Sequence, residues 1–103
     1  MNNKIVNGNL IRLGLIGAGR WGRVYIKTLE RMDGFSLVRL ASGNPESRSL
    51  VHKDCQISDN WRDVAEAKDL DGVIIAVPPM MHGKITRAAI SASNPVLVEK
   101  PLT

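Results

Sequence analysis

The sequence of 103 residues lacks much of what several classes of protein require. Cys55 is the only cysteine, so an internal disulfide is impossible, and no Cys/His group has the spacing of a zinc site. Two Trp, one Tyr and one Phe leave few rings for stacking on bases. No run approaches the ~18 apolar residues of a membrane span, and residues 1–9 are polar without a hydrophobic signal core. We therefore expect a cytoplasmic protein without metal or membrane anchor.

The remaining composition is that of an ordinary small globular domain, with 44% apolar and 23% charged residues. The net charge is +4, but the basic residues are scattered and are not interleaved with aromatics. This pattern argues against a nucleic-acid partner, whereas a basic surface attracts a small polyphosphate equally well. We expect residues 1–9 to form a flexible tail and residues 10–103 to form one domain.

Strand-like and helix-like hydrophobic periods alternate along the chain. The predicted strands are 11–16, 35–41, a short piece around 56–57, 72–77 and 96–98. Four helices are predicted. The first follows the first strand and ends at Asp33-Gly34, and the second spans 45–53. The third is capped by Asp59 or Asn60, and the fourth spans 81–93. This alternation predicts an α/β fold, a doubly wound, mainly parallel Rossmann sheet of about five strands with helices on both faces.

The helical periods also predict which side chains face inward. On the first helix the expected apolar face consists of Trp21, Val24, Tyr25, Leu29 and Met32. On the third helix it consists of Trp61, Val64 and Ala65. Asn44 is the expected N-cap of the helix that Pro45 opens.

The stretch "GLIGAGRWGR", residues 14–23, places three glycines in a G-x-G-x-x-G spacing between the first strand and the first helix. In that context Gly17 permits a tight turn, Gly19 lets the backbone approach a pyrophosphate, and Gly22 lets helix and strand pack closely. Arg20 and Arg23 oppose the helix dipole, a cost that an anionic ligand relieves; the alternative is that both are simply solvated. The pattern predicts a dinucleotide-binding turn.

The end of the second strand, "LASGNPESR", lacks the acid that usually binds the ribose of NAD. Ser42 stands in its place. A hydroxyl, the Asn44 amide and the nearby Arg48 suit a 2′-phosphate better, so the sequence favours NADP over NAD. The alternative is that Ser42 only starts a turn and Arg48 is a solvated helix residue.

Three segments resemble the N-terminal domain of the glucose-fructose oxidoreductase, inositol dehydrogenase and MocA (Gfo/Idh/MocA) family. They are the glycine turn, "DGVIIAVPPMMHGKI" after residue 70, and the closing "VLVEKPLT". The resemblance covers about residues 10–103. It implies an NAD(P)-binding Rossmann domain of an oxidoreductase that acts on CH-OH groups of a sugar, polyol or related compound. "SGNPES" resembles the NADP-using branch of the family.

The resemblance also implies roles for single residues. Glu99, Lys100 and Pro101 match the family's E-K-P tripeptide, whose lysine lies beside nicotinamide and substrate and assists proton transfer; Lys100 is thus the catalytic candidate and Glu99 a neighbouring cofactor-site residue. Pro78 and His82 match the loop that lines the cofactor. Val77 and Pro79 replace its usual threonine and asparagine, which removes two polar contacts. Trp21, inside the turn, is either a packing residue or a cofactor contact.

The family's second domain, which brings most substrate contacts, has no counterpart in these 103 residues. We therefore expect the chain alone to bind cofactor without turnover, and a longer protein to be an NAD(P)-dependent oxidoreductase. The alternatives are a stand-alone nucleotide-binding or regulatory module, and a degenerate fold used for protein interaction. The strand 96–98 is expected to expose an edge that favours self-association or a partner chain.

Overall fold

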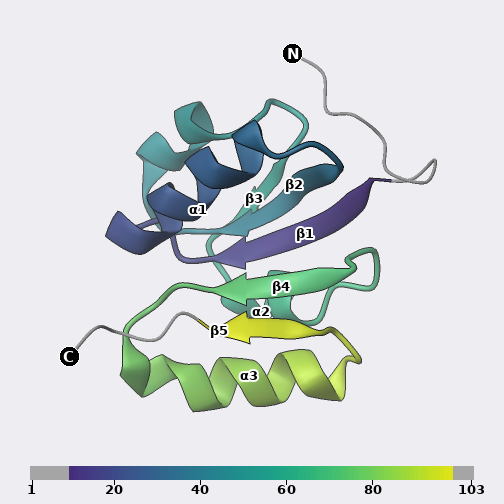
Figure 1. Ribbon diagram of the computed structural model, residues 1–103. Helices are drawn as coiled ribbons and strands as arrows, with labels where there is room; N and C mark the ends of the chain where they lie inside the picture. Colours follow the sequence, from purple (N-terminus) through teal and green to yellow (C-terminus); the bar gives the residue numbers. More distant parts are fainter. Residues whose placement is uncertain (1–9, 99–103) are drawn as a thin grey trace.

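The computed structural model describes residues 10–98, and in it five strands form one parallel sheet in the order β3-β2-β1-β4-β5 (Figure 1). The predicted tail 1–9, Glu99 and Lys100 lie outside the described residues. The strand bounds are β1 (Ile11–Ile16), β2 (Phe35–Ala41), β3 (Gln56–Ser58), β4 (Gly72–Ile75) and β5 (Val96–Val98). The predicted α/β class and parallel five-stranded sheet are confirmed.

Helices cover both faces of the sheet, as predicted. Their bounds are α1 (Arg20–Arg31), α2 (Trp61–Ala65) and α3 (His82–Ser91), with 3-10 turns η1 (Pro45–Leu50) and η2 (Pro79–Met81). Successive residues of a strand point to opposite faces. Leu15, Leu40 and Ile74 pack against α1, whereas Ile16 and Ile75 pack in a second core with α2 and α3. All four residues of β4 are buried, because helices lie on both sides of it.

The inward face of α1 differs from the prediction. The helix buries Gly22, Ile26 and Leu29, while Trp21 and Val24 are 41% and 48% exposed. The buried stripe begins at Gly22, because a residue without a side chain lets the first turn of α1 approach the backbone of the glycine turn. Larger side chains are thereby rotated toward solvent, and Met32 is also among the exposed ones.

Several element boundaries also differ from the prediction: α1 ends at Arg31 and β4 at Ile75, each two residues before the predicted end. The segment after Asn44 is a 3-10 turn ending at Leu50, although Asn44 caps it as expected by accepting from the Glu46 N-H. Helix α3, predicted over 81–93, starts only at His82, after η2, and ends at Ser91. It ends there because Ser93 adopts a positive φ of 66° and the Asn94 N-H bonds back to the Ala89 carbonyl.

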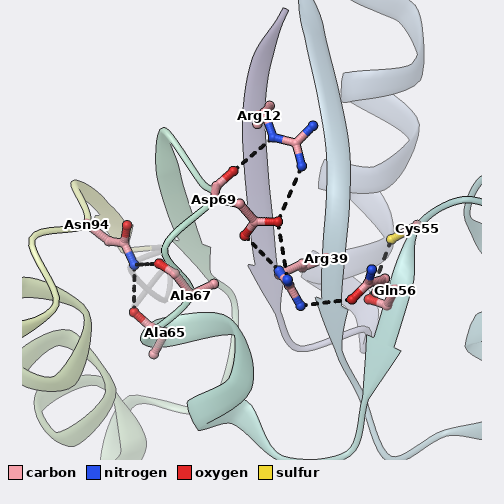
Figure 2. A network of polar contacts seen from close by, with 8 residues as sticks. All are labelled: Arg12, Arg39, Cys55, Gln56, Ala65, Ala67, Asp69 and Asn94. Atoms are coloured by element: carbon pink, nitrogen blue, oxygen red, sulfur yellow. Dashed lines mark hydrogen bonds and ion pairs between the residues drawn. The ribbon is translucent and has the colours of Figure 1, made fainter.

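A bulge in β2 sets the direction of one arginine. The register between β1 and β2 shifts after Leu13, so that Arg39 lies opposite Gly14. The Arg39 guanidinium then reaches Asp69, in the loop before β4, with Nε to Oδ1 at 2.9 Å (Figure 2). Arg12 donates to the same carboxylate at 3.3 Å. We call Arg12, Arg39 and Asp69 the arginine-aspartate cluster; it ties this loop to the sheet, away from the strand ends where the glycine turn lies.

Candidate functional site

An open cleft of about 340 Å³ lies at the carboxyl ends of β1, β2 and β4. Its border includes residues 16–19 of the glycine turn and residues 41–44 after β2. Val77 and Met81 close the side that follows β4, and Asp59 and Trp61 close the side that follows β3. In open α/β sheets this edge, where the strand order reverses between β1 and β4, is where ligands bind. The topology thus brings the glycine turn and the end of β2 together, as the sequence predicted.

The three glycines are required for different reasons. Gly17 has a φ of +104°, and a Cβ there would lie 2.3 Å from the Ala76 carbonyl oxygen. A Cβ on Gly22 would lie 2.1 Å from the Gly17 carbonyl oxygen. The protein's own backbone therefore explains both residues.

Gly19 is different, because a Cβ on it would meet nothing within 4 Å. Its backbone is extended, with φ −78° and ψ −154°, which any residue adopts. Neither strain nor packing within the described chain requires glycine at this position. The space in front of Gly19 belongs to the cleft, and a ligand that approaches the backbone there is what a side chain would exclude.

No side chain of helix α1 or of its N-cap offsets the positive end of the helix dipole. Gly19 is the N-cap, no side chain caps the helix, and its first turn holds no acid. Arg20 and Arg23 stand there instead. The Arg20 guanidinium lies over the Trp21 ring, 5.9 Å from its centroid. The positive end of the helix dipole and two cations thus lie at the glycine turn, an arrangement that fits an anionic ligand.

A second cleft, of about 550 Å³, lies on the other side of the same turn. It is bordered by Ala18, Gly19, Arg20, Arg23, Val24, Lys27 and Asn44. Three of these seven residues are cationic. The two clefts share Ala18, Gly19 and Asn44, so a ligand that lies across the glycine turn reaches both.

The segment after β2 is held by its own hydrogen bonds. The hydroxyls of Ser42 and Ser47 lie 2.7 Å apart, and Ser42 Oγ accepts from the Asn44 N-H. Ser42 and Asn44 border the first cleft. The Arg48 side chain is exposed and donates from Nη2 to the His52 carbonyl at 2.6 Å. Arg48 is not among the residues that border either cleft at the glycine turn.

The loop after β4 carries the other two predicted residues. His82 donates its Nε2-H to the Val77 carbonyl at 2.6 Å, which closes the loop on itself. Pro78 precedes η2 and does not border the cleft, whereas Val77 and Met81 do. Sequence reasoning did not name Asp59 as a site residue. It proposed Asp59 or Asn60 as a cap, and Asn60 is the residue whose side chain accepts from Arg62 N-H.

A cleft of about 620 Å³, larger than the two at the glycine turn, lies elsewhere, between α1, β2 and η1. Its lining includes Phe35, Leu37 and the free Cys55, and burial raises the pKa of that thiol to about 11. A thiol with this pKa is protonated at neutral pH and therefore a poor nucleophile. The chemistry of the glycine turn, rather than cleft size, identifies the functional edge.

The fold, the turn and the open space at Gly19 define a dinucleotide-binding domain of the doubly wound class. The model of the Gfo/Idh/MocA oxidoreductase family, NAD-binding Rossmann fold, matches residues 11–103. The chain belongs to this family, as its sequence motifs predicted.

Relatives of this chain are much longer than it is. Inositol 2-dehydrogenase 4 of Saccharopolyspora erythraea is 38% identical over 99 residues, which cover 90% of this chain and 29% of that protein. A crystal structure from Magnetospirillum magnetotacticum, described as an oxidoreductase, is 53% identical with a TM-score of 0.83 and covers 92% of this chain and 31% of its own. The chain thus spans about 30% of the length of these relatives.

A more distant structure shares the fold alone. Scyllo-inositol dehydrogenase from Lactobacillus casei, with bound NAD(H) and scyllo-inositol, is 23% identical with a TM-score of 0.77 and covers 90% of this chain and 28% of its own. Within residues 10–98, no helix has the length and apolarity to cross a membrane. The same residues hold no group of three or more His, Cys, Asp or Glu placed to hold a metal ion.

Proposed function

We propose that this chain is the cofactor domain of a hydride-transferring oxidoreductase and that it prefers NADP to NAD. The observation that carries dinucleotide binding is Gly19, whose missing side chain leaves space that nothing in the described chain fills. The uncapped, acid-free N-terminus of α1 supports an anion in that space. A nicotinamide cofactor, when bound, supplies hydride transfer to or from a carbon that carries oxygen.

The residues of this chain bind and orient. The N-H groups that begin α1, together with the cation Arg20, neutralise the pyrophosphate charge. The turn at Ser42 and Asn44 faces the cleft without a carboxylate, which supports the NADP preference because an acid there would repel a 2′-phosphate. Val77, Trp61 and Met81 give the cleft apolar walls.

The substrate end of the proposal rests on the family resemblance. Lys100, with Glu99 beside it, is proposed to lie near nicotinamide and substrate and to assist proton transfer. The substrate class is a sugar, polyol or related compound. Pro78 and His82 are proposed to line the cofactor; His82 acts by holding the loop through its bond to the Val77 carbonyl. The cytoplasmic location, the lack of a nucleic-acid or membrane partner, and self-association or partner docking at β5 stay predictions.

Cofactor preference is tested by isothermal titration of the 103-residue chain with NADPH and with NADH. We expect tighter binding of NADPH. Ser42→Asp should reverse the order, because its carboxylate repels the 2′-phosphate and accepts from a ribose hydroxyl. Equal or tighter binding of NADH by the unmodified chain would contradict the preference.

Catalytic incompleteness is tested separately. The chain should not reduce NADP with a panel of sugars and polyols, because hydride transfer needs a substrate carbon held close to the nicotinamide. The Lys100→Ala variant serves as the control in the same assay. Substrate-dependent reduction that disappears in this variant would show that the chain is catalytically complete.

A further inference from the structure

We propose that Arg23 on α1, and not Arg48, is the main cation that recognises the 2′-phosphate of NADP, in the second cleft beside the glycine turn. The proposal deepens the proposed function and rests on it. The sequence favours Arg48 because it follows Ser42 by six residues. The structure gives Arg48 another partner and gives the cleft another arginine.

The first step concerns what borders the second cleft. Asn44, at the end of β2, forms one wall, and α1 forms the other with Arg20, Arg23 and Lys27. These positions are separated by three and four residues, so their side chains lie on one side of the helix. A group attached to the adenosine ribose near Ser42 and Asn44 therefore faces three cations across the cleft.

The second step concerns the position of the arginine itself. Arg23 is held over the turn by its Nε, 3.4 Å from the Ala18 carbonyl oxygen. Its Nη2 lies 4.0 Å from a Glu46 carboxylate oxygen, and the Glu46 side chain is 79% exposed. At that separation the ion pair is loose, and a solvated pair of this kind is worth little. The turn thus orients Arg23, while its Nη2 is available to bind a phosphate in place of the Glu46 carboxylate.

The third step concerns charge. A phosphate monoester carries about −1.5 to −2 charges at neutral pH, and an arginine fork binds such a group through two N-H donors. Arg48 donates from Nη2 to the His52 carbonyl, in an exposed turn outside both clefts. Arg23 instead shares its cleft with Lys27, so the charge of the phosphate is matched on the α1 side.

The test compares Arg23→Gln with the matched variant Arg48→Gln in the full chain, by titration with NADPH and NADH. Arg23→Gln should weaken NADPH binding about tenfold or more and change NADH binding less than about twofold, because a hydrogen bond to a charged group is lost only with NADPH. Arg48→Gln should leave both affinities unchanged. Glu46→Gln, which leaves Arg23 in place, should tighten NADPH binding and not NADH binding.

The outcomes separate this proposal from the proposed function. Selective loss of NADPH binding in Arg48→Gln, or an equal loss of both cofactors in Arg23→Gln, would overturn the role of Arg23. Unchanged NADPH affinity in both Arg23→Gln and Glu46→Gln would overturn it as well. Failure of the proposed function appears earlier, in the unmodified chain, as binding of neither cofactor or as a preference for NADH.

Discussion

Charged side chains are arranged differently at the two ends of the sheet. Toward the amino ends of β1 and β4, the arginine-aspartate cluster pairs its charges within the protein: Arg39 donates from Nε and Nη2 to the two oxygens of Asp69, at 2.9 and 3.2 Å (Figure 2). At the carboxyl ends, the first turn of α1 holds arginines and no acid. Paired charges fix a loop, whereas cations beside an uncapped helix N-terminus favour an anion from outside.

The same contrast holds for buried polar groups. Asn94, 6% exposed in the loop before β5, donates both hydrogens of its side-chain amide to the carbonyls of Ala65 and Ala67, at 2.8 and 2.9 Å (Figure 2). The glycine turn instead leaves empty space in front of Gly19. The amide of Asn94 is satisfied within the protein, whereas the space at Gly19 is open. Substitutions should therefore change stability at the first end and binding at the second.

The largest effect is expected at Gly19. Gly19→Val should weaken NADPH binding at least about 100-fold, because its side chain fills the space where the pyrophosphate meets the backbone. Stability should fall by roughly 1 kcal/mol or less, since only the N-cap preference changes. Fluorescence titration gives the affinity and urea unfolding gives the stability. Gly83→Ala, in α3 and outside both clefts, is the control. Unchanged affinity in Gly19→Val would show that the ligand does not lie on this turn.

A smaller effect, of the opposite kind, is expected at Asn94. Asn94→Asp replaces the side-chain NH₂ group, which donates to two carbonyls, with an oxygen that cannot donate to them. The substitution should lower the free energy of unfolding by about 1–3 kcal/mol. NADPH affinity, measured where the variant is folded, should stay the same. An unchanged free energy of unfolding together with lost NADPH affinity in this variant would contradict the difference between the two ends.

The smallest effect is expected at Asp69. A hydrogen bond from Arg39 is the main cause that lowers the pKa of Asp69 in the folded protein. Its stabilising contribution is therefore present above the ordinary carboxyl pKa of about 4 and is lost as the pH falls through the lower folded-state value. Because its side chain is 41% exposed, Asp69→Asn should cost only about 1 kcal/mol or less at pH 7.

The pH dependence is the readout that separates this pair from a packing effect. Urea unfolding of the protein and of Asp69→Asn, from pH 7 down to pH 2.5, should show the two stabilities converging as the carboxylate is protonated. A difference that stays constant with pH would mean that Asp69 does not stabilise the loop through its charge.

The sequence predicts well what local rules decide. The class of fold, the parallel sheet of about five strands and the tight turn at Gly17 follow from periodicity and from the glycine spacing. The Asn44 cap follows from Pro45 beside it. The motifs identify the family because its spacings are preserved between distant segments.

What the sequence does not reveal depends on contacts between segments. The predicted apolar face of α1 is right at Leu29 and wrong at Trp21 and Val24, because periodicity weighs these two more than the close contact of Gly22 with the turn. The arginine-aspartate cluster joins β1, β2 and the loop before β4, and its geometry depends on a bulge that no short motif signals. Proximity in sequence favours Arg48, whereas packing places Arg23 at the cleft.

The most direct test of the difference between the two ends is a backbone amide NMR titration of the chain with NADPH. Large shifts are expected at Gly17, Gly19 and Gly22 and at residues 42–44, because the ligand lies against the backbone of these two segments. The amides of Arg12, Arg39 and Asn94 should move little. Saturable shifts confined to the amides around Arg12, Arg39 and Asn94, or no saturable shift at the glycine turn, would contradict the account.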